Sequence, residues 1–183
     1  MKGTSNIPIL MFLPIVFFVL LVGAFYVGLQ REDDNSLPSV LIGEMAPDIT
    51  KNELYNGSEV TAELMKSSGI KLVNFWASWC PPCRAEHSKL LEIAESGTVI
   101  VGVNIKDDKE NAVSYLQRYG NPFKAVPYDP DGRTAIDWGV TAPPETFIVN
   151  KDGKVLFRFA GPLVGQDYLS RFLPAYEAAL SQE

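Results

Sequence analysis

The sequence predicts an α/β domain built on one sheet, with a separate apolar segment ahead of it. Residues 70–77 and 98–104 are nearly continuous runs of strand-forming apolar residues, as expected for central strands covered on both faces. Each run is followed by apolar residues at helical spacing. The turn signal at residues 150–154 joins two further strand candidates, Glu145–Val149 and Val155–Ala160. The expected order is therefore strand, helix, strand, helix, hairpin and terminal helix.

The segment ahead of the first strand is expected to add a small hairpin and one short helix. A turn at Asn56-Gly57 would join residues 49–54 to residues 58–60. Residues 61–68 favour a short helix that Thr61 could cap.

The other helices follow from the spacing of apolar residues. The helix at Cys83 should run to about Gly97, and residues 108–119 form an amphipathic helix with one apolar side, comprising Ala112, Val113, Leu116 and Tyr119. Residues 125–128 could form a third short strand. A turn at residues 129–132 should lead into a brief helix that ends at Trp138. The terminal helix, residues 166–182, should be irregular near Pro174.

Residues 1–30 are expected to be a membrane anchor, residues 31–45 a linker and residues 46–183 the folded domain. No charged residue occurs over residues 7–29, and at ~1.5 Å per residue a helix of that length crosses a hydrocarbon core of ~30 Å. The alternative is a cleaved signal peptide, whose apolar region is shorter and ends in small residues. Lys2 before the segment and acidic residues after it favour a single pass with the N-terminus in the cytoplasm and the domain outside. If the chain is bacterial, this is the inner membrane with the domain facing the periplasm, where disulfides persist.

Charge in the remainder of the chain argues against nucleic acid as a partner. All 22 acidic residues and all but one of the 16 basic residues lie beyond position 30, so this part is net negative. A negative surface repels phosphate backbones and anionic lipid surfaces. The charge is interpreted as a means of solubility.

Two cysteines three positions apart, Cys80 and Cys83, are the only cysteines in the chain, and they lie at a predicted strand-to-helix junction. This placement indicates a redox dithiol, because a helix N-terminus stabilises a thiolate at Cys80 and puts Cys83 within reach to resolve a mixed disulfide. Pro81 and Pro82 fit the first turn but lack N–H donors. The pKa of the nucleophilic thiol should therefore be lowered only moderately, which suits a reductant.

Other uses of this cysteine pair fit less well. A disulfide across two residues closes too small a loop to stabilise a fold much. Zinc needs about four ligands, and haem attachment needs a histidine directly after the second cysteine, where this chain has Arg84. No metal site and no cofactor beyond the redox-active disulfide are expected.

Two titratable residues follow the cysteines. His87, the only histidine, shares a helical side with Cys83, Leu90 and Ala94, which favours a packed, hydrogen-bonded core residue over a catalytic base. Glu86 lies a little over one turn beyond Cys80. It either sits beside the active site, where a carboxylate opposes thiolate formation, or is an exposed helix charge.

From about residue 40 to residue 180 the chain resembles the thioredoxin superfamily. More closely, it resembles the membrane-anchored thiol:disulfide interchange proteins of bacterial cytochrome c maturation, the DsbE/CcmG type. The motifs that carry the resemblance are residues 74–87 (Asn-Phe-Trp-Ala-Ser-Trp-Cys-Pro-Pro-Cys-Arg-Ala-Glu-His), residues 102–107, residues 128–133 and residues 139–147 (Gly-Val-Thr-Ala-Pro-Pro-Glu-Thr-Phe). The resemblance implies a thioredoxin-like α/β fold, a central mixed sheet flanked by helices, with an N-terminal extension and a central insertion near residues 102–107.

The resemblance also implies roles for individual residues. Cys80 matches the nucleophile and Cys83 the resolving thiol. Pro144 matches the cis-proline that presents backbone to the substrate, and Glu86 and Glu145 match acidic residues that line the active-site groove.

Three further positions concern proton transfer and docking. Asn74 stands where general thioredoxins have a buried aspartate, so Glu86 becomes the leading candidate for the base. Trp79 belongs with these two residues to the set that tunes the redox centre. Pro143, next to Pro144, removes a backbone N–H from the substrate groove, which is expected to alter docking.

The function implied by the resemblance is a thiol:disulfide oxidoreductase. It would receive electrons from a membrane thiol reductase and reduce a disulfide in apocytochrome c or a haem-lyase component. A general periplasmic thiol reductant, a disulfide donor and a non-catalytic apocytochrome-binding module remain as alternatives.

Overall fold

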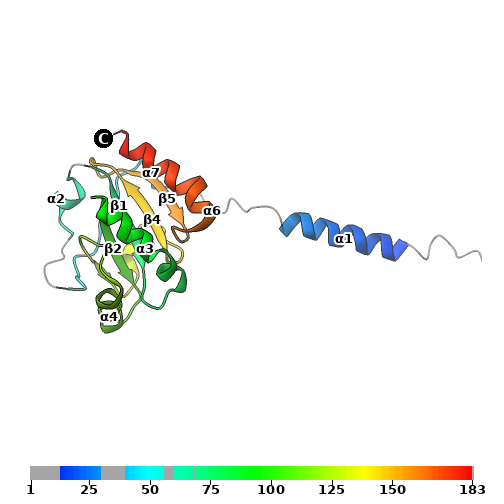
Figure 1. Cartoon of the computed structure of the whole chain (residues 1–183), viewed down its shortest axis with the longest axis horizontal. Coiled ribbons are helices and arrows are strands. Elements are labelled where there is room, and N and C mark those ends of the chain that lie inside the picture. The colour runs from blue at the N-terminus through cyan, green and yellow to red at the C-terminus, as the bar shows by residue number, and fades with distance from the viewer. Residues whose placement is uncertain (1–12, 30–39, 56–59, 68, 183) are drawn as a thin grey trace, which may run out of the picture. The chain divides into compact units, whose positions relative to one another are not determined.

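The computed structural model describes residues 13–29, 40–55, 60–67 and 69–182, which fall into two compact units, Met1–Leu37 and Pro38–Glu183. The described part of the first unit is one helix, α1 (Leu13–Leu29), which carries no charged residue (Figure 1). No helix among the described residues is both long and apolar enough to cross a membrane. Residues 1–12 and 30 of the expected anchor, and residues 31–39 of the expected linker, lie outside the described residues.

The second unit is built on a five-stranded mixed sheet with the order β3-β2-β1-β4-β5 (Figure 1). The strands are β1 (Lys71–Trp76), β2 (Val99–Ile105), β3 (Tyr128–Asp129), β4 (Glu145–Val149) and β5 (Val155–Ala160). β1 lies at the centre, parallel to β2 and antiparallel to β4, and all six of its residues are buried. This confirms the prediction from its continuous apolar run.

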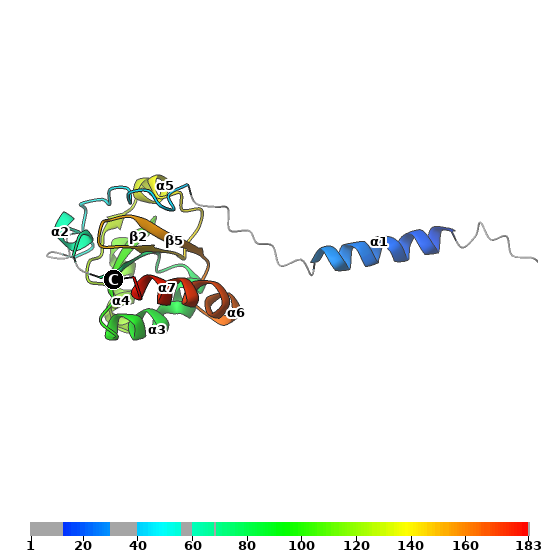
Figure 2. The ribbon, with the colours of Figure 1, turned by 90° about the horizontal axis from the view of Figure 1, so that it is seen from above.

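Helices cover both faces of this sheet. α3 (Pro81–Glu95), α4 (Lys109–Tyr119) and α7 (Leu173–Leu180) pack on one face, while α5 (Arg133–Asp137) and the N-terminal extension with α2 (Ala62–Met65) pack on the other (Figure 2). α7 follows α6 (Gly165–Asp167) and a π-helical segment, Tyr168–Phe172. Because side chains alternate along a strand, Asn74 of β1 lies on the same face as Leu72 and Trp76, against α3.

Several element predictions are confirmed. β4 and β5 have the predicted bounds, and the brief helix α5 precedes Trp138. The terminal helix is irregular as expected, because Pro174 lacks an N–H and the turn ahead of it is π-helical.

The N-terminal extension differs from its prediction. Residues 49–54 form no strand and make only one isolated bridge, from Glu53 to Pro127. The reason is that this backbone pairs with a distant loop: the Leu54 N–H donates to the Val126 carbonyl and Asn52 accepts from Tyr128. The predicted turn at Asn56-Gly57 lies outside the described residues.

The bounds of other elements also differ from their predictions. The expected strand over residues 125–128 is replaced by β3, Tyr128–Asp129, and an isolated bridge from Ala125 to Val101, since Pro127 between them cannot donate to a ladder. α2 is shorter than expected, although Thr61 does cap it by accepting from the Leu64 N–H at 3.1 Å. In α4, Tyr115 rather than Tyr119 is buried, because its ring packs against Trp76 with 5.5 Å between centroids.

Gly102 in β2 leaves room for an aromatic ring to pack on the strand. A Cβ at Gly102 would lie 2.4 Å from the nearest ring atom of Phe123, so the ring packs directly on the strand backbone. Phe123 in turn stacks on Trp76 with 5.5 Å between ring centroids. Phe123 thus packs on both β2 and the last residue of β1, the strand that leads to Cys80.

Candidate active site

The two cysteines lie where β1 passes into α3. Cys80 is the N-cap of α3 and forms a disulfide with Cys83, with an S–S distance of 2.10 Å. Pro81 and Pro82 occupy the first turn and have no N–H, so the nearest helix donor is the Cys83 N–H, which lies 3.2 Å from Cys80 Sγ. This donor and the positive end of the helix would stabilise a thiolate at Cys80.

The turn before Cys80 is held by the loop that follows β2. The Asp107 carboxylate accepts from the Ser78 N–H at 2.5 Å, from the Ser78 hydroxyl at 2.8 Å and from Asn104 Nδ2 at 2.9 Å. Trp79 is 52% exposed, and its indole N–H donates to the Lys106 carbonyl at 2.9 Å. Sequence reasoning missed Asp107 and Ser78, because a single polar residue in a loop gives no spacing signal.

Glu86 is a buried carboxyl group on the sheet side of α3. Oε1 accepts from Asn74 Nδ2 at 2.8 Å and Oε2 accepts from the Leu163 N–H at 2.8 Å, so three separate elements meet at this side chain. Burial raises the pKa of Glu86 to about 7, and the two hydrogen bonds only partly oppose that rise. The alternative of an exposed helix charge is therefore wrong.

Asn74 links Glu86 to β4. Its Nδ2 donates to Thr146 Oγ1 at 3.0 Å as well as to Glu86, while its buried Oδ1 has no hydrogen-bond partner among the described residues. An amide cannot take a proton at this position. Asn74 is therefore a hydrogen-bond donor to Glu86 and not a proton acceptor.

His87 belongs to the core, as the sequence indicated. It is 7% exposed, its Nε2 lies 3.1 Å from the Gly120 carbonyl oxygen, and its ring meets Tyr115 edge-on. Burial lowers the pKa of His87 below its ordinary value. Burial therefore favours the neutral form of this packed imidazole.

The loop of residues 141–144 faces the disulfide. The Pro143–Pro144 peptide bond is cis, which the resemblance implied for Pro144. The Pro143 carbonyl oxygen is 3.5 Å from Cys80 Sγ, and the Pro144 carbonyl accepts from the Gly161 N–H at 2.9 Å. The loop thus brings backbone atoms to the reacting sulfur.

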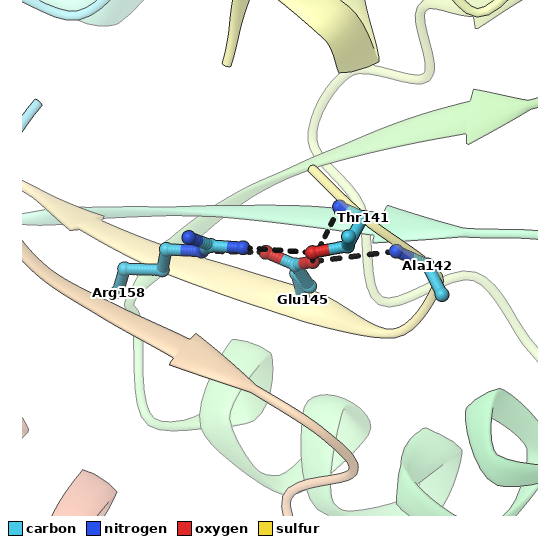
Figure 3. Close-up of polar contacts among 4 residues, drawn as sticks. All are labelled: Thr141, Ala142, Glu145 and Arg158. Carbon is cyan, nitrogen blue, oxygen red and sulfur yellow. Dashed lines mark hydrogen bonds and ion pairs between the residues drawn. The ribbon is translucent and has the colours of Figure 1, made fainter. Parts of the chain in front are cut away.

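Glu145, expected among the groove residues, is 1% exposed and lies behind this loop (Figure 3). Its Oε1 accepts from the Thr141 N–H at 2.7 Å, the Thr141 hydroxyl at 3.1 Å and the Ala142 N–H at 3.4 Å. Its Oε2 pairs with Arg158 Nε of β5 at 2.7 Å, and Arg158 Nη2 also reaches Thr141 Oγ1. The carboxylate therefore supports the loop, and Thr141 and Arg158 are partners that the sequence did not suggest.

Comparisons with known proteins agree with this geometry. The Redoxin family matches residues 41–172. The chain is 48% identical over 174 residues to the thiol:disulfide interchange protein DsbE homolog of Paracoccus denitrificans, with 95% of this chain and 97% of that protein covered. It is 42% identical over 154 residues to the thiol:disulfide interchange protein HelX of Rhodobacter capsulatus, with 84% and 88% covered.

A solved structure shows the same architecture. The crystal structure of a DsbE-type thiol:disulfide interchange protein from Chlorobium tepidum is 27% identical and has a TM-score of 0.60, with 74% of this chain and 95% of that chain covered. The chain therefore belongs to the redoxin family with a thioredoxin-like fold, and within it to the DsbE/CcmG/HelX thiol:disulfide interchange proteins, which makes it a thiol:disulfide oxidoreductase.

Proposed function

We propose that the protein is a membrane-anchored, periplasmic reductant that reduces a disulfide in apocytochrome c or in a haem-lyase component. A membrane thiol reductase would return electrons to it, and the Cys80–Cys83 pair would be its only redox group. The observation that carries the proposal is a disulfide at the N-terminus of α3, with a buried acid on the same helix whose pKa is raised to about 7.

The reaction moves two electrons from the dithiol to the substrate. The Cys80 thiolate attacks one sulfur of the substrate disulfide, and the S–S bond breaks to leave a mixed disulfide and a substrate thiolate, which takes up a proton. Cys83 loses its proton, attacks Cys80 Sγ and releases the second substrate sulfur as a thiol. The Cys80–Cys83 bond that results is the state seen in the structure.

Glu86 would be the group that takes up the Cys83 proton. A base works best when its pKa lies near the operating pH, and burial puts the pKa of this carboxyl at about 7. Asn74 holds one carboxylate oxygen and Leu163 the other, which fixes the orientation of the group.

We infer the location of the domain from the N-terminal segment. α1 is apolar throughout, and the uncharged stretch extends N-terminally from it to residue 7 in the sequence. Lys2 is the only charged side chain ahead of it, which favours a cytoplasmic N-terminus and a periplasmic domain. The periplasm is a compartment in which disulfides persist and need a dedicated reductant.

The test is to trap the substrate. Full-length protein with Cys83→Ser, expressed in a bacterium that matures c-type cytochromes, should accumulate a mixed disulfide between Cys80 and apocytochrome c or a haem-lyase component. Cys80→Ser is the control and should trap nothing. A broad set of trapped periplasmic proteins would instead indicate a general thiol reductant. If no substrate is trapped and a double Cys→Ser variant still supports cytochrome maturation, the protein would be a non-catalytic binding module.

A further inference from the structure

A short turn, residues 77–80, leads from β1 to the dithiol. It is closed by a hydrogen bond from the Cys80 N–H to the Ala77 carbonyl at 3.2 Å, and its two central residues are Ser78 and Trp79. The turn determines where the Cys80 sulfur lies at the start of α3. Groups that hold the two central residues therefore also hold the reacting sulfur.

The Cys80 sulfur depends on one backbone donor. Pro81 and Pro82 have no N–H to offer. The N–H that reaches the sulfur is that of Cys83, at 3.2 Å from Cys80 Sγ. A hydrogen bond to a thiolate favours the charged form, and its strength depends on distance and direction. Cys80 therefore ionises readily only while the turn keeps its sulfur aligned with this N–H.

Charged side chains hold Ser78 on both sides. The Asp107 carboxylate accepts from the Ser78 N–H at 2.5 Å and from its hydroxyl at 2.8 Å. On the other side, Arg84 Nη2 donates to the Ser78 carbonyl at 3.0 Å. The next residue adds a further restraint, because the Trp79 indole N–H donates to the Lys106 carbonyl at 2.9 Å. Both backbone polar groups of Ser78 are thus fixed.

Asp107 is itself anchored to the sheet. Its carboxylate also accepts from Asn104 Nδ2 in β2, and its carbonyl accepts from the Tyr128 hydroxyl in β3, both at 2.9 Å. Lys106, directly ahead of it, has a φ of +45°, a left-handed conformation that is uncommon for residues other than glycine. Such conformations persist where the surrounding structure holds them, and they are frequent at functional sites. The loop after β2 therefore presents Asp107 to the turn from a well-held base.

We propose that Asp107 is a positioning residue for thiol–disulfide exchange, with Arg84 as its counterpart on the other side of Ser78. Because it fixes the turn, Asp107 keeps the Cys80 sulfur in line with the Cys83 N–H while a substrate disulfide is attacked. The inference rests on the proposed order of attack, in which Cys80 reacts first, and does not depend on the identity of the substrate.

Charge and position make opposite predictions for Asp107. A carboxylate beside the turn disfavours a second negative charge, so by charge alone its loss would lower the pKa of the Cys80 thiol. The positioning role predicts the reverse: a turn released from Asp107 loses the aligned Cys83 N–H, and the pKa of Cys80 rises. The sign of the change therefore separates the two effects.

The experiment measures the pKa of Cys80 in the full-length reduced protein in mild detergent. The rate of alkylation by iodoacetamide, which requires the thiolate, is followed from about pH 4 to pH 10, and mass spectrometry identifies the cysteine that reacts. Asp107→Asn places an NH₂ group against the Ser78 N–H or the Asp108 N–H, which both donate to the carboxylate in the natural protein. Asp108→Asn is the matched control, because it removes the same charge from an exposed neighbour and asparagine still caps α4.

We expect Asp107→Asn to raise the pKa of Cys80 by about one unit, which slows alkylation about tenfold below that pKa and leaves the rate at high pH unchanged. Asp108→Asn should not raise it. An unchanged or lowered pKa in Asp107→Asn would overturn the inference. Ser78→Ala removes one contact and no charge, so it should raise the pKa by a smaller amount; if Asp107→Asn does not fold, an unchanged pKa in Ser78→Ala overturns the inference instead. Alkylation of Cys83 ahead of Cys80 in the natural protein would refute the proposed order of attack, and the inference would fall with it.

Discussion

Glu86 should make the stability of the oxidised protein depend on pH. The pKa of this carboxyl is raised from 4.5 to about 7 by burial. A raised pKa means that the protonated acid favours the folded state. The protonated Glu86 carboxyl makes its full contribution to the free energy of unfolding below about pH 4.5, and this contribution is lost as the pH rises through about 7. At about 1.4 kcal/mol for each pKa unit, the free energy of unfolding should fall by about 3 kcal/mol across this window.

Glu86→Gln removes the titration while keeping the shape of the side chain. In the natural protein, Asn74 Nδ2 and the Leu163 N–H each donate to one Glu86 oxygen. The glutamine amide has only one oxygen, so its NH₂ group must face one of these two donors and leave that donor without an acceptor. That mismatch should cost about 1–3 kcal/mol at every pH. The variant should therefore be less stable than the natural protein in acid and similar to it, or more stable, at pH 8.

The assay is urea unfolding of the oxidised full-length proteins, in the same detergent, from about pH 4 to pH 8. Glu95→Gln, on an exposed part of the same helix, is the matched control and should keep the pH profile of the natural protein. Parallel profiles for the natural protein and Glu86→Gln would refute the reasoning, because Glu86 would then titrate alike in the folded and unfolded chain.

Two substitutions test the packing behind the site by urea unfolding. Gly102→Ala should lower the free energy of unfolding by about 1–3 kcal/mol, because its Cβ would overlap the Phe123 ring; an unchanged midpoint would contradict that packing. Arg158→Met should cost about 3–5 kcal/mol by leaving the Glu145 carboxylate buried and unpaired, whereas the exposed control Arg133→Met should change little. Equal losses in the two arginine variants would show that the buried pair does not support the loop.

Local chemistry made part of the fold predictable from sequence. The hairpin of β4 and β5 has its predicted bounds because its turn is specified within five residues: Asn150 Oδ1 accepts from the Asp152 and Lys154 N–H groups. Cys80 and Cys83 stand out for the same reason, as a pair at fixed spacing. The prediction of a strand at residues 49–54 was wrong because this segment pairs with a loop more than 70 residues away, and no local pattern reveals that pairing.

The environment of each site residue depended on such distant contacts. Helical spacing placed Glu86 near the cysteines but left its burial open, and the contact that completes it comes from Leu163, 77 residues later. Glu145 was assigned to the groove by resemblance, whereas its position behind the loop follows from Arg158 on the neighbouring strand. Isolated polar residues such as Asp107 acquire a role only when the chain folds.

The reduction potential of the Cys80–Cys83 pair tests the central claim most directly, because it decides the direction of electron flow. It is measured on the full-length protein at equilibrium with a glutathione or dithiothreitol couple. A reductant should have a potential near that of thioredoxin, about −270 mV, or not far above it. A potential near about −120 mV, as for a strong oxidant, would contradict the account and make the protein a disulfide donor.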